Sequence, residues 1–248
     1  MSRRFVANYG MDREAFDKAQ TAAVKKALST VEDAVKQKHI RTLILGSHRE
    51  KSAGSFWSNI HRISLETNQI SAWKFCHVFH KLMRDGHANV LIDSLKYRTK
   101  IVEVGKFYTH LRQGYGRLIY QYCRVLVSKL EFHQKNSTVP GNMQVSDEQL
   151  DALGEEDVNA WFELVIEMLD YCEELLLLQR EVFNSLDQSR SSSLTKAGQC
   201  RLAPLILCIL DSSCLYDMMV KMMFRLHSHL PPDVLADLRE RFIKEFVE

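Results

Sequence analysis

The chain has 248 residues, a formal net charge of +2 and 46% hydrophobic residues, with only four prolines and ten glycines. This composition is typical of a folded chain with one large core, and it excludes a disordered protein. The small net charge argues against nucleic acid as a partner.

Charge is unevenly distributed along the chain. Between residues 18 and 49, seven Lys or Arg stand against two acids, a local charge of +5. Between residues 147 and 187, thirteen acids stand against one arginine, a local charge of −12. The basic end is therefore predicted to be the docking face and the acidic stretch a solvated flank.

The six cysteines form no C-x-x-C pair and lie in apolar, helix-like surroundings. This pattern predicts reduced, buried thiols in a cytosolic protein. No apolar signal-peptide segment follows the N-terminal Met-Ser-Arg-Arg. The most apolar run, residues 202–210, contains Pro204 and ends at Asp211, so it is too short to span a membrane. We therefore expect any membrane contact to be peripheral.

The hydrophobic periodicity predicts an all-α chain, because no segment alternates apolar and polar residues as a half-buried strand would. Residues 1–11 are expected to be a flexible basic arm, and residues 12–248 a single domain cut from a longer protein. Residues 136–154 are expected to be a loop, residues 188–198 a Ser-rich connection, and residues 201–230 the most buried helix. Other helices are expected from residue 12 and over 52–63, 71–84, 90–107 (one or two helices), 115–132, 157–186 and 234–247. About ten helices without a fixed-period repeat predict an irregular helical solenoid.

Residues 29–45 allow two interpretations. Ser29 and Glu32 have the spacing of a capping box, which would start one long helix through residue 45. At about 100° per residue, however, Val31 and Val35 fall nearly opposite the apolar stripe of residues 40–44, and Lys36 falls on that stripe. We therefore predict a break near Val35 and a new helix from about Lys36.

The predicted break makes the basic stretch a candidate anion site. A helix N-terminus carries unpaired N–H groups and a partial positive charge, so lysines there are unfavourable unless an anion completes the site. Lys36, Lys38 and His39 can ring an object on the helix axis, and Lys26 can approach from the preceding helix. The alternative is an ordinary solvated charged face, and the residues alone leave both interpretations open.

The helix expected at 71–84 carries two further candidate groups. Four possible metal ligands lie on it or just after it: Cys76, His77, His80 and His87. They are interleaved with aromatic residues, which favours core packing over a metal site. The basic residues of the same helix are candidates for a second, solvent-facing basic patch: Lys74, Lys81 and Arg84. No catalytic constellation is present, so we do not expect an enzyme.

Several motifs resemble a known family. Lys26, nine intervening residues and then Lys36-Gln-Lys38-His39 resemble the inositide-binding motif of ANTH domains, the membrane-binding modules of clathrin adaptors. Four other blocks resemble the huntingtin-interacting protein 1 branch of that family: Trp73–His87, Asp157–Asn159, Phe183–Asp187 and Gly198–Leu205. The resemblance runs from Phe16 to about Phe246.

The resemblance implies a right-handed α-solenoid that recognises phosphoinositides, chiefly phosphatidylinositol 4,5-bisphosphate, in clathrin-mediated endocytosis. We expect no cofactor. The residues that match the family motif are Lys26, Lys36, Lys38 and His39. Charge and proximity add Lys25 and Arg41 as auxiliary candidates, and Arg3 and Arg4 as weaker ones.

The partners that the resemblance implies are bisphosphate-containing membranes and an adjacent epsin-type ENTH domain. Clathrin light chain and F-actin would bind through parts of the parent protein that lie outside these 248 residues. The expected location is cytoplasmic, peripheral at the plasma membrane and at clathrin-coated pits and vesicles. The alternative function is a helical scaffold whose grooves bind partner proteins, with membrane contact incidental.

Overall fold

The computed structural model describes residues 2–111, 114–153, 157–189 and 192–247, and side chains from residue 12 onward except 153, 188 and 247. Within these ranges it contains no strand and twelve α-helices. They are α1 (Ser2–Ala27), α2 (Gln37–Glu50), α3 (Gly54–Ile60), α4 (Gln69–Asp85), α5 (Asn89–Ser94), α6 (Arg98–Phe107), α7 (Gly116–Lys135), α8 (Asp147–Leu153), α9 (Val158–Ser189), α10 (Lys196–Leu202), α11 (Leu205–His229) and α12 (Ala236–Val247). Three single 3₁₀ turns complete the list: η1 (Leu65–Thr67), η2 (Leu95–Tyr97) and η3 (Tyr108–His110).

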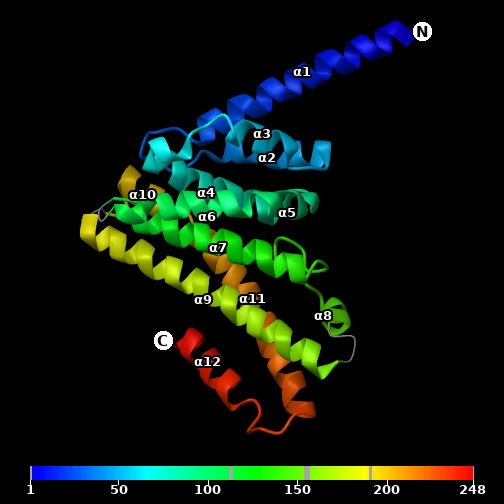
Figure 1. Cartoon of the computed structure of the whole chain (residues 1–248), viewed down its shortest axis with the longest axis vertical. Coiled ribbons are helices and arrows are strands. Elements are labelled where there is room, and N and C mark those ends of the chain that lie inside the picture. The colour runs from blue at the N-terminus through cyan, green and yellow to red at the C-terminus, as the bar shows by residue number, and fades with distance from the viewer. Residues whose placement is uncertain (1, 112–113, 154–156, 190–191, 248) are drawn as a thin grey trace.

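From α1 to α9 the helices stack largely in chain order along an elongated molecule, whereas α10 lies back beside the loop between α1 and α2 and α11 runs behind α7 and α9 to the C-terminal end (Figure 1). α1 packs on α2, α4 on α7, α7 on α9, and α9 on both α11 and α12. Each helix thus contacts mainly its neighbours along the stack, which is how a solenoid buries a continuous core. The all-α solenoid expected from the sequence is confirmed.

Two elements differ from the sequence expectations. α1 begins at Ser2, where an arm was expected through residue 11, although side chains before Asp12 lie outside the described residues. The segment expected to be a loop up to residue 154 contains α8, which begins with the acidic residues Asp147 and Glu148. Acidic side chains stabilise the positive N-terminal end of a helix, which explains why α8 begins there. The sequence did not predict α8 because so short a helix has too few residues to show a periodic pattern.

The most buried helix is α4, not the segment 201–230 as expected. Thirteen of the seventeen residues of α4 are buried, including Lys74 and Arg84. The prediction that Lys74 and Arg84 form a second, solvent-facing basic patch is therefore wrong. Cys76 lies 3.8 Å from Cys123, Sγ to Sγ, and His80 is fully buried, so both serve core packing.

α11 instead divides its apolar residues between two faces. Met219 and Met222 are fully buried in the core, and α11 packs against α9, whereas Ile206 and Phe224 are 63% and 73% exposed. The stretch Lys196–His229 passes a test of length and composition for a membrane span, with a mean hydropathy of 1.5. The helix breaks between α10 and α11 at Ala203–Pro204, and 39% of the apolar window is buried inside the fold. α11 is therefore a partly buried helix that packs against α9 on one side and leaves apolar side chains uncovered on another.

A buried polar cluster holds α4, α7, α9 and α11 together around Asp211. Its carboxylate pairs with the Arg84 guanidinium, accepts hydrogen bonds from Lys129 Nζ and His80 Nε2 at 3.0 and 2.8 Å, and accepts another from the Tyr171 hydroxyl. Burial lowers the pKa of both Lys129 and His80 well below their ordinary values, and neighbouring cations lower them further. One carboxylate thus accepts hydrogen bonds from three buried donors and pairs with a fourth buried group, the Arg84 guanidinium, which is how an apolar core tolerates them.

Candidate anion-binding site at the start of α2

The chain breaks where the phase of its apolar residues predicted. α1 ends at Ala27, and α2 begins at Gln37 with Lys36 as its N-cap. The continuous helix suggested by Ser29 and Glu32 is wrong, because both side chains bind partners outside the loop between α1 and α2. The predicted placement of Lys36 and Lys38 at a helix start is confirmed.

The first turn of α2 is not capped by its own side chains. Lys36 has extended backbone angles (φ −69°, ψ 122°) and makes no side-chain cap hydrogen bond, and the first turn contains no acid. An ammonium group has no acceptor to offer the unpaired N–H groups of the helix. The start of this fourteen-residue helix therefore combines free N–H donors, the positive end of the helix dipole and added positive charge.

Cations from both helices gather around His39. The pKa of His39 is lowered from its usual value, first by burial and then by the positive charges of Lys38, Lys26 and Lys36. Lys26 lies in the last turn of α1, and all three lysines are exposed. Among the carboxylates that the structure describes, none pairs with these lysines within 4.0 Å. We call Lys26, Lys36, Lys38 and His39 the basic cradle.

The loop that separates the two halves of the cradle, residues 28–36, is clamped from beneath by Lys74. This lysine is 2% exposed, and its Nζ donates to Ser29 Oγ, Val31 O and Asp33 Oδ1 at 2.9, 2.6 and 2.7 Å. The hydrogen bond from Lys74 is also the main reason that the pKa of Asp33 is lowered. A buried ammonium group is tolerated when all three of its donors are satisfied, and here the loop supplies every acceptor.

A second clamp holds Glu32 of the same loop. Its Oε1 accepts a hydrogen bond from the Tyr115 hydroxyl at 2.8 Å and lies 3.4 Å from Arg201 NH2. The Arg201 guanidinium lies over the Tyr115 ring, 4.2 Å from its centroid. Ser71 Oγ, on α4, donates to Leu28 O at 2.9 Å. The loop is therefore fixed by α4, α10 and the start of α7, so the cradle is held in place before any ligand binds.

The auxiliary candidates flank the cradle on the same two helices. Lys25 lines an outer face of α1 with Arg13 and Lys18, and Arg41 is exposed one turn further along α2. Neither contributes to the lowered pKa of His39. The side chains of Arg3 and Arg4 lie outside the described residues.

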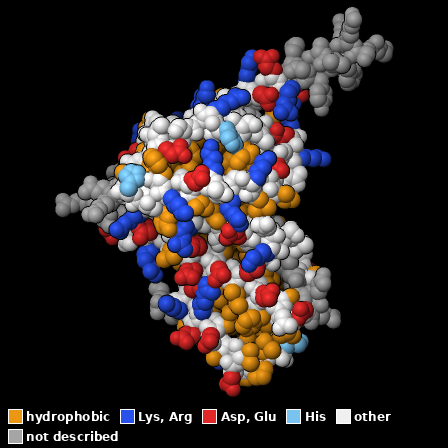
Figure 2. Space-filling model, viewed as in Figure 1, with side chains coloured by type: hydrophobic (Ala, Val, Ile, Leu, Met, Phe, Trp, Pro, Cys, Tyr) orange, Lys and Arg blue, Asp and Glu red, His pale blue; other side chains and the backbone are white. Residues whose placement is uncertain are grey.

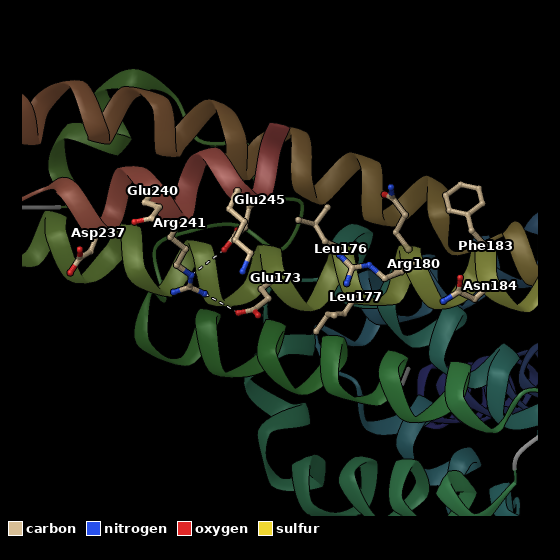
Figure 3. Close-up of a pocket in the computed structure, with 12 residues that line it drawn as sticks. Glu173, Leu176, Leu177, Arg180, Phe183, Asn184, Asp237, Glu240, Arg241 and Glu245 are labelled. Carbon is tan, nitrogen blue, oxygen red and sulfur yellow. Dashed lines mark hydrogen bonds and ion pairs between the residues drawn. The ribbon is translucent and has the colours of Figure 1, made fainter. Parts of the chain in front are cut away.

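Positive and apolar side chains occupy different parts of the visible face. Lys and Arg are more frequent over its upper half, and an apolar patch lies in its lower half beside acidic and basic side chains (Figure 2). A groove of about 740 Å³ lies between α9 and α12 in the lower half (Figure 3). It is lined by four acidic and three basic residues, and one of the latter, Arg241, already pairs with Asp170, Glu173 and Glu245. This groove is therefore poorly suited to a multiply charged anion.

The residues that clamp the loop could not be found by local sequence reasoning. Lys74 binds residues more than forty positions away, and Arg201 binds Glu32 across 169 positions. Periodicity identifies the face of a helix on which a residue lies but not its distant partner.

The chain matches the ANTH domain family over residues 19–248. It is 54% identical over 237 residues to huntingtin-interacting protein 1 of Homo sapiens, covering 96% of this chain and 23% of that protein. It is 46% identical over 231 residues to Huntington interacting protein related 1 of Caenorhabditis elegans, covering 93% and 25%. Endocytosis protein end4 of Schizosaccharomyces pombe is 26% identical over 229 residues, covering 91% and 20%. The chain thus spans a quarter or less of the length of these relatives.

Two solved structures share the fold. One is the ENTH domain from epsin-2 in complex with phosphatidylinositol 4,5-bisphosphate, with a TM-score of 0.84 at 23% identity, covering 94% of this chain and 88% of that one. The other is the endocytic adaptor complex AENTH, with a TM-score of 0.76 at 24% identity, covering 93% and 89%. Together, the helical stack and the family match over almost the whole sequence show that this chain belongs to the ANTH domain family.

Proposed function

We propose that this domain binds the phosphorylated headgroup of a phosphoinositide, chiefly phosphatidylinositol 4,5-bisphosphate, at the basic cradle. One observation carries the proposal: three exposed lysines from two helices gather around His39 at an uncapped helix start. Lysine ammonium groups are flexible point charges, suited to several phosphates on one ring, while the N–H groups of α2 bind along the axis. The four residues of the cradle act in binding, and the domain performs no catalysis.

The relatives support a role in endocytosis. One is an endocytosis protein by name, and a structural neighbour was solved with the bisphosphate lipid bound. The domain would then recruit a longer adaptor to the cytoplasmic face of the plasma membrane at clathrin-coated pits. Clathrin and actin would bind other parts of that adaptor, and an ENTH domain is a candidate neighbour on the membrane.

The expected affinity of one domain is low. A basic residue near an anionic surface contributes about 1 kcal/mol, so a local charge of +5 supplies roughly 5 kcal/mol. This corresponds to a Kd nearer to millimolar than to micromolar, before specific headgroup contacts are added. Firm attachment would therefore need several domains in one assembly.

Vesicle sedimentation tests the proposal. We expect the domain to sediment with vesicles that carry the bisphosphate lipid and to bind much less to vesicles matched in total charge with phosphatidylserine. The reason is that the cradle directs several hydrogen-bond donors at one phosphorylated inositol ring. The spread-out charge of phosphatidylserine instead attracts the basic end of the domain as a whole. Equal binding to both vesicles would contradict headgroup recognition.

A scaffold for partner helices is the second candidate function. The observation that favours it is the uncovered apolar side of α11, where Ile206, Ile209 and Leu210 are 63%, 59% and 42% exposed. A contiguous exposed apolar surface often marks an interaction site. Weak, charge-driven binding to both kinds of vesicle would favour this function.

A further inference from the structure

Two exposed apolar side chains lie on the loops at the cradle end of the molecule. Val31, in the loop between Lys26 and Lys36, is 61% exposed. Leu194, in the turn just before α10, is 87% exposed, more than any other large apolar side chain among the described residues. Exposing a leucine to this extent loses the free energy that its burial would provide.

The turn that carries Leu194 is well fixed. Thr195 caps α10 through its Oγ1, which accepts from Gly198 N at 3.0 Å and donates to Ser192 O at 2.8 Å. A Cβ on Gly198 would lie 2.1 Å from Ser192 O, so the turn packs directly against the helix. The backbone hydrogen bond from Thr195 N to Ser192 O, at 3.0 Å, closes the turn. Leu194 is thus presented to solvent on an ordered support.

The two loops are neighbours. Arg201 NH2, on α10, lies 3.4 Å from Glu32 Oε1, and Trp73 Nε1 of α4 donates to Cys200 O at 2.9 Å. In Figure 1, α10 lies beside the loop that joins α1 to α2. Lys36 and Lys196 both lie close enough to Asp33 to lower its pKa. Lys196 therefore extends the positive surface from the cradle towards Leu194.

We propose that Val31 and Leu194 insert into the interfacial region of an anionic bilayer while Lys196 contacts its headgroups beside the cradle. This inference rests on the proposed function and adds a second, apolar membrane contact to it. Isolated apolar side chains flanked by lysines match the layering of a bilayer, where acyl chains lie beneath anionic headgroups. A partner helix would instead need a continuous apolar stripe, which α11 offers and these two loops do not.

Tryptophan fluorescence tests this insertion directly. The native Trp57, Trp73 and Trp161 are 1%, 1% and 8% exposed, so lipid-borne quenchers will reach them poorly. Leu194→Trp places a reporter at the proposed contact. Phe224→Trp is the matched control, because Phe224 is 73% exposed but lies about five turns from the start of α11, which itself follows α10. On vesicles that contain the bisphosphate lipid and brominated acyl chains, we expect quenching of the first variant and not of the second.

A binding measurement accompanies the quenching. Leu194→Ser should bind vesicles about tenfold more weakly than the wild type, because it loses the insertion of one leucine. Phe224→Ser should bind like the wild type. Both side chains are exposed, so the melting temperature should stay unchanged. If Leu194→Trp sediments normally but is not quenched, the inference is overturned and the proposed function stands. If the wild-type domain fails to sediment with bisphosphate vesicles, both are overturned.

Discussion

The basic cradle and the Asp211 cluster use the same residue types in opposite ways. In the cradle, three exposed lysines lie near enough to His39 to lower its pKa, and no carboxylate among the described residues pairs with them. In the cluster, Lys129, Arg84 and His80 surround one fully buried carboxylate. Both regions concentrate positive charge, but only the second contains its own anion.

This difference separates a binding site from a structural one. Buried donors must be satisfied within the fold, because water cannot reach them. Exposed donors at a helix start gain from an added anion, which binding can supply. Changes to the cluster should therefore alter stability and leave binding intact, and changes to the cradle should do the reverse.

The largest expected effect is that of Asp211→Asn. It removes the one buried carboxylate, among the described residues, that pairs with Arg84 and Lys129, and breaking a buried ion pair costs about 3–5 kcal/mol. We expect a loss of this size in the free energy of unfolding, measured by denaturant titration. Asp217→Asn, on the same helix but with a 60% exposed side chain, is the control and should change stability by less than about 1 kcal/mol. Similar losses in both variants would contradict the structural role of the cluster.

Next in size is the effect of Lys36→Glu combined with Lys38→Glu. Removing two basic charges near an anionic surface costs about 2 kcal/mol in binding, roughly thirtyfold in affinity, and the added acids cost more. We expect sedimentation with bisphosphate vesicles to fall below detection while the melting temperature stays within about 2 °C, since both side chains are exposed. A fall in stability with binding retained would assign these lysines to the structure.

Lys74→Met should have a smaller effect that combines a more mobile loop with weaker binding, because Lys74 is a buried cation that holds the loop of the exposed cradle. The variant keeps an apolar stem but frees the three loop oxygens that Lys74 now binds. We expect faster amide hydrogen exchange over residues 29–36 and about tenfold weaker vesicle binding, on the scale of one lost charged hydrogen bond. Lys81→Met, on the same helix, is the control, since Lys81 pairs with Asp85 at 3.7 Å and makes no hydrogen bond to the described residues of the loop. Unchanged exchange in the loop would rule out the clamp.

The smallest expected effect concerns pH and His39. Its pKa in the free domain lies below the usual value, and a bound phosphate would raise it. The complex would then hold more protons than the free domain, so the His39 contribution strengthens binding as pH falls from about 7.5 to 6, by roughly threefold. Lipid phosphates lose charge over the same range, so the measured quantity is the ratio of wild-type affinity to that of His39→Gln. A ratio independent of pH would exclude proton uptake by His39.

The sequence predicted the solenoid and most helix positions because each helix carries a periodic apolar face. It also located the start of α2 at Lys36, since an unbroken helix would have placed that lysine on an apolar stripe. It wrongly predicted that α11 is the most buried helix, because hydrophobicity does not reveal how much of a helix its neighbours cover. Ile206 and Phe224 of α11 remain exposed, whereas Lys74 and Arg84 of α4 are buried. Those two cations face partners distant in sequence, which no local pattern encodes.

The cradle could be predicted only in part. Helix phase placed Lys36 and Lys38 at the helix start, and the family resemblance named the ligand. The contacts that hold the loop between α1 and α2 were not predicted. Tyr115 and Arg201 reach Glu32 from other helices, and Ser29 binds Lys74. Ser29 and Glu32, whose spacing resembles a capping box, therefore serve these contacts.

The most direct test of the cradle is an NMR titration with the soluble headgroup, inositol 1,4,5-trisphosphate. We predict that the largest amide shift changes fall on residues 37 and 38, whose N–H groups lie at the uncapped start of α2, and that they vanish in the Lys36→Glu, Lys38→Glu variant. Changes concentrated on α9–α12, or unchanged in the variant, would contradict headgroup binding at this site.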